Sequence, residues 1–199
     1  MPSHPTWESV WAGLLAEACT LAGKTERPGV PVHARCAAAV VLARSGYETF
    51  TNELIEWRHL PPELKGRHYA SSLSGIYDHL GCGKPDLGKG SIWYAMELVV
   101  QLRNAVVHHD ATPVAPAKFP GEIEKRLRYF GLLTAGATSQ SWERQAFTPA
   151  AAAWACRVGG EAILTLEALP GQRIRSYASV ERAVTAALRK LTPKPPERA

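Results

Sequence analysis

One apolar stripe limits the fold of this chain more than any other feature of its sequence. It runs along residues 32–57, where apolar side chains recur every three or four positions, at Val32, Cys36, Ala39, Ala43, Tyr47, Phe50, Leu54 and Trp57. This spacing is the period of an α-helix, and it predicts a helix of about seven turns with one long apolar face. Such a face must be buried against other helices. Because no sustained period-two alternation occurs anywhere in the chain, the sequence predicts an all-α protein.

Proline, glycine and capping residues divide the rest of the chain into further helices. The predicted ranges are 7–22, 61–80, 91 to a point before Pro113, 121–133, 149–169 and 178–191. Residues 134–148 are predicted to form a polar linker. Trp142 in that linker is therefore a candidate aromatic anchor for an interface or a partner site.

The predicted helices form a single domain over residues 1–191. Its core is expected at residues 32–110, in a helical bundle to which the helices of residues 121–191 are added. Residues 192–199 contain three prolines and almost no apolar side chains, which predicts a disordered tail.

The positive charge is concentrated near the end of the chain. The net charge is +5, and residues 171–199 hold seven basic residues against two acidic ones. Such a segment can bind RNA phosphates, because neutralising phosphates releases counterions, or it can be a solvated helix face. The sequence leaves both interpretations open.

The sequence also bears on compartment and on metal binding. Its first residues lack the basic start and apolar run of a signal peptide, and no stretch approaches about 20 apolar residues, so we expect a cytoplasmic protein without a membrane span. The four cysteines form no CxxC pair, which favours reduced, mostly buried thiols over a disulfide framework or a cysteine-bound metal. We expect no metal and no cofactor.

Arg103 is the first of the candidate catalytic residues. On the helix that begins near Ser91, it falls beside an apolar stripe. A buried guanidinium needs a partner, because an unpaired buried charge costs several kcal/mol. The candidate supporting carboxylates are Glu48, Glu53 and Glu97.

Asn104 and His108 lie on a polar face of the same predicted helix. They are four residues apart, so Asn104 can orient His108. In the last turn of a helix, the dipole favours the protonated imidazole, which suits His108 to proton transfer near neutral pH. Arg103 beside it can hold a phosphate with forked hydrogen bonds. These three side chains suffice for cleavage of RNA by its own 2′-hydroxyl without a metal, although they can also simply tie helix ends together.

The run Leu102-Arg103-Asn104-Ala105-Val106-Val107-His108-His109-Asp110 resembles the signature of the HEPN superfamily. That signature is an arginine, a polar residue that is often asparagine, a short apolar spacer and a histidine. Outside the motif, the resemblance consists of helical layout over about residues 32–110. It implies a helical bundle that dimerises to form a composite ribonuclease site, with Arg103 and His108 catalytic and Asn104 assisting.

The resemblance further implies a metal-independent endoribonuclease that acts as a toxin or effector in prokaryotic defence or toxin–antitoxin systems. Family members without demonstrated cleavage serve as binding or scaffold modules, so the alternative is a non-catalytic module of a defence complex. Asp110 stands where members silenced by a nucleotidyltransferase antitoxin carry a tyrosine. That form of regulation is not expected, whereas another antitoxin or a defence-complex partner is. His109 is a possible substitute for His108, which we favour because it shares the face of Asn104.

A second group of basic residues lies around Pro61 and Pro62. Arg58 and His59 precede this turn, and Lys65, Arg67 and His68 follow it. Lys65, Arg67 and His68 are candidate contacts for the RNA backbone, with a solvated turn as the alternative.

Overall fold

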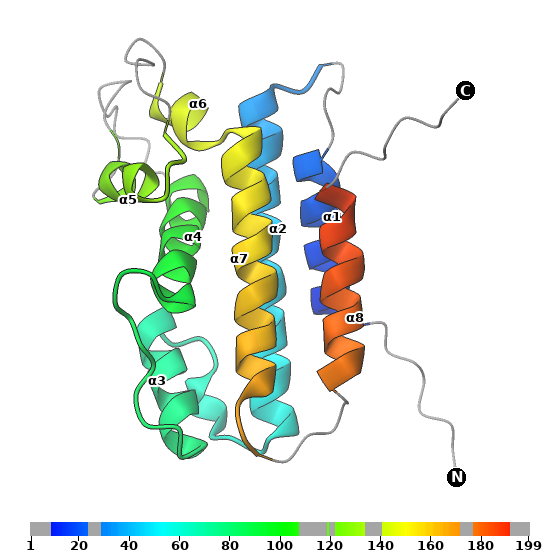
Figure 1. The fold of residues 1–199 in the computed structure, drawn as a ribbon, viewed down its shortest axis with the longest axis vertical. Coiled ribbons are helices and arrows are strands. Elements are labelled where there is room, and N and C mark those ends of the chain that lie inside the picture. Colours follow the sequence, from blue (N-terminus) through cyan, green and yellow to red (C-terminus); the bar gives the residue numbers. More distant parts are fainter. Residues whose placement is uncertain are drawn as a thin grey trace.

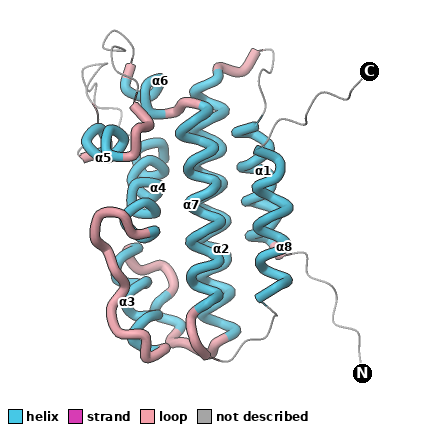
Figure 2. Tube along the Cα trace, in the orientation of Figure 1, coloured by secondary structure: helices cyan, strands magenta, loops and turns pink. Residues whose placement is uncertain are grey.

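The computed structural model describes residues 9–23, 29–107, 119, 122–133, 141–171 and 177–191. Its helices are α1 (Val10–Gly23), α2 (Val32–Trp57), the 3-10 helix η1 (Pro62–Leu64), α3 (Tyr69–His79), α4 (Ile92–Val107), α5 (Ile123–Tyr129), α6 (Trp142–Ala146), α7 (Pro149–Ala168), α8 (Tyr177–Leu188) and the 3-10 helix η2 (Arg189–Leu191). Helices and connecting loops make up all of these ranges, with no strand among them (Figure 2), which confirms the all-α prediction. Within the same ranges, no helix is both long and apolar enough to cross a membrane.

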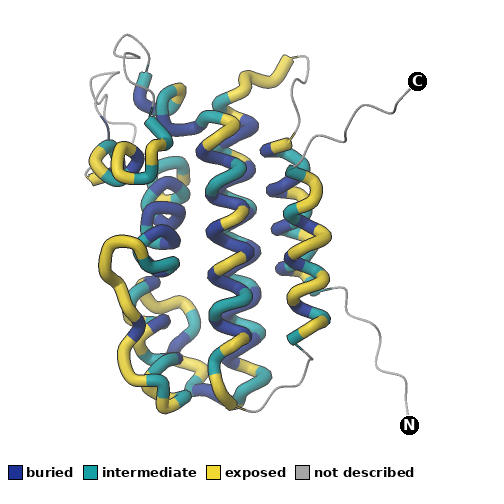
Figure 3. Tube along the Cα trace, viewed as in Figure 1, coloured by how far each residue is buried: buried dark blue, intermediate teal, exposed yellow. Residues whose placement is uncertain are grey.

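Two long helices form the centre of the molecule. Helices α2 and α7 lie side by side and run in the same direction, with α1 and α8 on one side and α4 on the other (Figure 1). The buried residues of these helices, marked along the chain in Figure 3, belong to one hydrophobic core cluster. We expected residues 121–191 to be an addition to a core at residues 32–110. The structure differs from that expectation, because α7 packs on α1, α2, α4 and α8 and supplies part of the core itself.

Small residues allow these helices to approach closely. A Cβ atom on Gly46 would lie 3.1 Å from the backbone oxygen of Trp11, where α2 meets α1. Likewise, a Cβ atom on Gly159 would lie 3.4 Å from the backbone oxygen of Ala43, where α7 meets α2. The ring of Trp11 then packs edge-on against Phe50, with centroids 5.3 Å apart. The periodicity of α2 predicted this face, whereas its partners follow from tertiary packing.

The segment predicted as one helix over residues 61–80 is divided. It begins with η1 and resumes only at Tyr69, in α3. Between them, Gly66 has φ +69°, a left-handed conformation that ends a helix. Leu64, only 2% exposed, anchors the turn in the core. The helix predicted over residues 61–80 therefore begins too early. Pro61 and Pro62 start only the single turn of η1, and α3 begins at Tyr69.

The linker predicted at residues 134–148 contains helix α6. Trp142 is 2% exposed and packs against Phe119 and Phe147, with ring centroids 6.3 and 5.9 Å away. The expectation of an exposed aromatic anchor is wrong. The sequence did not predict the burial of Trp142 because α6 is too short to show a periodic apolar pattern.

Helices α2 and α7 end at the same end of the molecule, where Arg58 joins them. Its Nη1 atom donates to the backbone oxygens of Leu169 and Pro170, both at 2.9 Å, and Nη2 donates to that of Glu167 at 3.1 Å. The carboxylate of Glu167 lies 3.9 Å from Nη2, and the two side chains are only 3% and 5% exposed. A cation here stabilises the negative ends of two parallel helix dipoles. Arg58 is therefore a structural residue and not part of an exposed basic patch.

His59 ends α2 in a strained conformation. Its φ is 53°, and the N–H of Leu60 donates to the backbone oxygen of Ile55, as in a Schellman motif. The corresponding position after α3 is Gly81. We expect His59→Gly to raise the free energy of unfolding by about 0.5–1 kcal/mol, because glycine adopts this conformation without steric cost. Urea denaturation measures the change, and an unaltered or lower midpoint would contradict it.

Candidate functional site

The last two turns of α4 carry the first two residues of the predicted catalytic set. Ser91 caps the start of this helix, since its Oγ atom accepts a hydrogen bond from the N–H of Tyr94 at 3.1 Å. The apolar face of α4 is buried through Met96, Val99 and Leu102. Its polar side is left at the surface near the end of the helix.

Arg103 and Asn104 form a side-chain pair there. Nη1 of Arg103 donates to Oδ1 of Asn104 at 3.1 Å. Arg103 is half-buried, Asn104 is exposed, and Val107 in the last turn is 49% exposed. The pair is therefore accessible to a ligand, and the amide fixes one edge of the guanidinium.

His108, His109 and Asp110 lie outside the described residues. The structure describes α4 up to Val107, the residue before His108. The roles assigned to His108 and His109 therefore stay predictions.

Two of the three carboxylates predicted to support Arg103 have other partners. Oε2 of Glu48 lies 3.2 Å from Nη1 of Arg44, one turn earlier in α2. Oε2 of Glu97 lies 2.9 Å from Nη1 of Arg126, which α5 brings against α4. Glu48 and Glu97 thus have ion-pair partners other than Arg103, and their supporting role stays a prediction. Glu53 is half-buried on α2, and its assignment to Arg103 stays a prediction.

Arg126 was missed by sequence reasoning. Besides its ion pair with Glu97, its guanidinium lies over the ring of Tyr94 at 4.5 Å from the centroid. These contacts hold α5 on α4, and they depend on the approach of two helices that the sequence does not specify. By contrast, the four-residue spacing of Arg44 and Glu48 on a helix does signal their pairing.

The three predicted RNA contacts lie together at the start of α3. Lys65 is ion-paired with Glu56, while Arg67 and His68 are exposed in the turn that precedes Tyr69. The structure thus places all three at the surface, and their role as RNA contacts stays a prediction.

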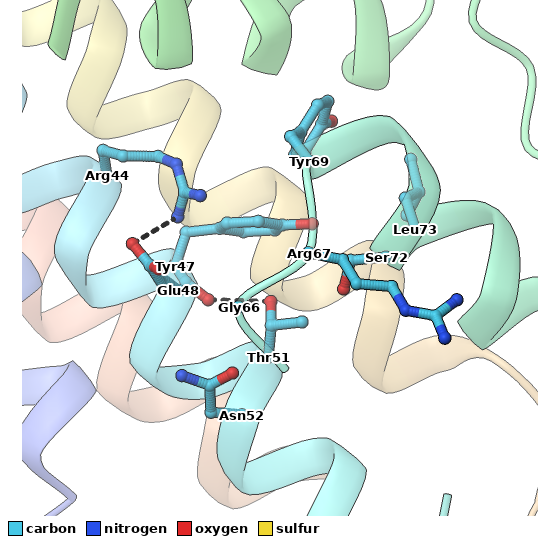
Figure 4. A pocket seen from close by; sticks show the side chains of 10 residues that line it. All are labelled: Arg44, Tyr47, Glu48, Thr51, Asn52, Gly66, Arg67, Tyr69, Ser72 and Leu73. Atoms are coloured by element: carbon cyan, nitrogen blue, oxygen red, sulfur yellow. Dashed lines mark hydrogen bonds and ion pairs between the residues drawn. The ribbon is translucent and has the colours of Figure 1, made fainter. Parts of the chain in front are cut away.

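A small polar hollow adjoins this turn, between α2 and α3 (Figure 4). Charged and hydroxyl side chains line it, among them Arg44, Glu48, Thr51, Arg67 and Ser72. Two tyrosines form part of its wall. Burial raises the pKa of Tyr47 and that of Tyr69 above the ordinary phenol value. Both phenols therefore stay protonated near neutral pH and cannot act as bases there.

Among the described residues, no group of three His, Cys, Asp or Glu side chains is placed to hold a metal ion. The same part of the chain has its four cysteines as free thiols, with Cys19, Cys36 and Cys156 buried. No family model, no curated protein and no solved structure matches this chain.

Proposed function

We propose that this protein is a metal-independent endoribonuclease of the HEPN type, with Arg103, Asn104 and His108 at its catalytic site. The observation that carries the proposal is the accessible Arg103–Asn104 pair on the last turns of α4. A guanidinium held by an amide at the surface is arranged to receive an anion such as a phosphodiester.

The chemistry follows from these side chains and from RNA itself. The 2′-hydroxyl oxygen attacks the adjacent phosphorus, and the bond from phosphorus to the 5′ oxygen of the next nucleotide breaks. His108 takes or delivers a proton in this step, and the other proton transfer falls to a second histidine or to water. Arg103 stabilises the negative charge that develops on the non-bridging oxygens. The products carry a 2′,3′-cyclic phosphate and a free 5′-hydroxyl.

A second copy of the chain completes the site in this proposal. A homodimer in which the two α4 ends face each other would supply two histidines to one RNA strand. As a toxin or effector of prokaryotic defence, such an enzyme would be controlled by an antitoxin or a defence-complex partner.

Substitution of Arg103 tests the proposal. We expect Arg103→Ala to lower the rate of RNA cleavage by about 10²–10³-fold, the usual loss when one group that stabilises an oxyanion is removed. Arg103→Lys keeps the positive charge but lacks the forked donors of a guanidinium, so we expect a smaller loss of the cleavage rate. The rate is measured with a fluorescent oligoribonucleotide, and thermal unfolding is recorded for each variant.

The matched control is Arg128→Ala. Arg128 is a half-exposed arginine on α5 that pairs with Glu124 at 2.8 Å. The Arg128→Ala variant should cleave RNA at the wild-type rate. Equal rates for wild type and a folded Arg103→Ala variant would exclude Arg103 from the reaction.

A further inference from the structure

The first turn of α3 separates two hollows, and Arg67 lines both of them. The first is the polar hollow between α2 and α3 (Figure 4). The second has a volume of about 410 Å³ and is lined by Ser71 and Ser74 of α3 and by Lys84 of the following loop. This volume is in the range of ligand-binding pockets. Hydroxyl groups and one basic side chain thus stand on each side of Arg67.

Arg67 and Lys84 are available to bind an anion. Both are exposed, and within the described ranges neither makes an ion pair or a side-chain hydrogen bond, unlike Lys65, which pairs with Glu56. Two carboxylates line the hollows. Glu48 is neutralised by Arg44, whereas Asp78 lies exposed in the second hollow. Cationic groups therefore remain in excess around the start of α3.

This turn is connected to α4 through Tyr69. The Oη atom of Tyr69 donates to the backbone oxygen of Trp93 at 3.3 Å. Asn104 follows Trp93 by eleven residues. At about 3.6 residues per turn and 1.5 Å per residue, the two lie on one face of α4 about 16 Å apart. Tyr69 therefore ties the start of α3 to one end of α4, and the Arg103–Asn104 pair lies toward the other end of the same helix.

We propose that the two hollows bind successive phosphates of the RNA strand that Arg103 and His108 cleave, with Arg67 between them. This inference rests on the proposed function. Arg67 holds one phosphate with its forked donors, and Lys84 holds the next as a point charge. Both residues position the strand, and neither contacts the reacting phosphorus.

Direct binding tests the inference. The full-length protein with His108→Ala, which keeps the RNA intact, is titrated with a fluorescent single-stranded oligoribonucleotide at several salt concentrations. We expect Arg67→Ala and Lys84→Ala each to weaken binding about fivefold. The double variant should lower the slope of log K against log salt by about 1.4, because each lost phosphate contact removes about 0.7 for a single strand.

The matched control is Arg157→Ala. Arg157 is exposed on α7 and lines neither hollow, so its loss should leave the affinity and the slope unchanged. An unchanged slope in the double variant would overturn the inference, as would an equal loss in Arg157→Ala. A wild-type protein that fails to cleave RNA would contradict the proposed function instead, and the binding titration reports independently of that result.

Discussion

Replacement of His108 by alanine is expected to lower RNA cleavage by about 10²–10⁴-fold while leaving the protein folded. The loss follows from removal of the group that transfers protons to or from the reacting oxygens, an effect of about 10²–10⁴-fold in acid–base catalysis. The fold should persist, because truncation of a side chain near a helix end costs little stability. The measurement is the cleavage rate of a fluorescent oligoribonucleotide, with thermal unfolding recorded on the same preparations.

His109 provides the control for this substitution. The His109→Ala variant should cleave RNA at the wild-type rate, because the sequence predicts that His108, and not His109, shares the face of Asn104. If His108→Ala stays active and only the double variant is inactive, His109 can carry the reaction and the assignment moves to the pair. Activity in the double variant would exclude both histidines.

Replacement of Arg58 by methionine should lower the free energy of unfolding by about 3–5 kcal/mol, the cost of breaking a buried ion pair from one side. The variant leaves Glu167, 5% exposed, without the guanidinium beside it, and removes a donor from three backbone oxygens at the end of α7. Chemical denaturation measures the loss. Adding Glu167→Gln should recover part of it, since the buried negative charge is then absent.

Arg128→Met is the matched control for stability. Arg128 and Glu124 are about half exposed, at 56% and 46%, so their ion pair should contribute less than about 1 kcal/mol. An equal loss of stability in Arg58→Met and Arg128→Met would show that Arg58 does not hold the two helix ends together.

The elements predicted correctly are those with strong local signals. The range of α2 follows from its apolar stripe, and the start of α4 from Ser91. The start of α7 follows from Thr148, whose Oγ1 atom accepts a hydrogen bond from the N–H of Ala151 at 3.1 Å, and from Pro149 in the first turn. The apolar period, the capping hydroxyl group and the proline of a first turn are all local signals, each readable from neighbouring residues in the sequence.

The features that sequence reasoning missed depend on distant parts of the chain. Arg58 differs from Arg67 only in its surroundings, since the end of α7 buries Arg58 while Arg67 stays exposed. Similarly, Glu97 is half-buried on α4, and only the position of α5 decides that Arg126 is its partner. At the candidate site, the spacing of Arg103 and Asn104 predicted neighbours on one helix. It did not predict their mutual hydrogen bond.

Cleavage of RNA in excess EDTA tests the central claim most directly. The purified protein, shown to be folded and dimeric, is incubated with a fluorescent oligoribonucleotide and with the all-deoxy oligonucleotide of the same sequence. We predict cleavage of the ribonucleotide strand only, with 2′,3′-cyclic phosphate ends, because the 2′-hydroxyl is the nucleophile and no metal is needed. Absence of cleavage, loss of cleavage on addition of EDTA, or cleavage of the deoxy strand would contradict this account.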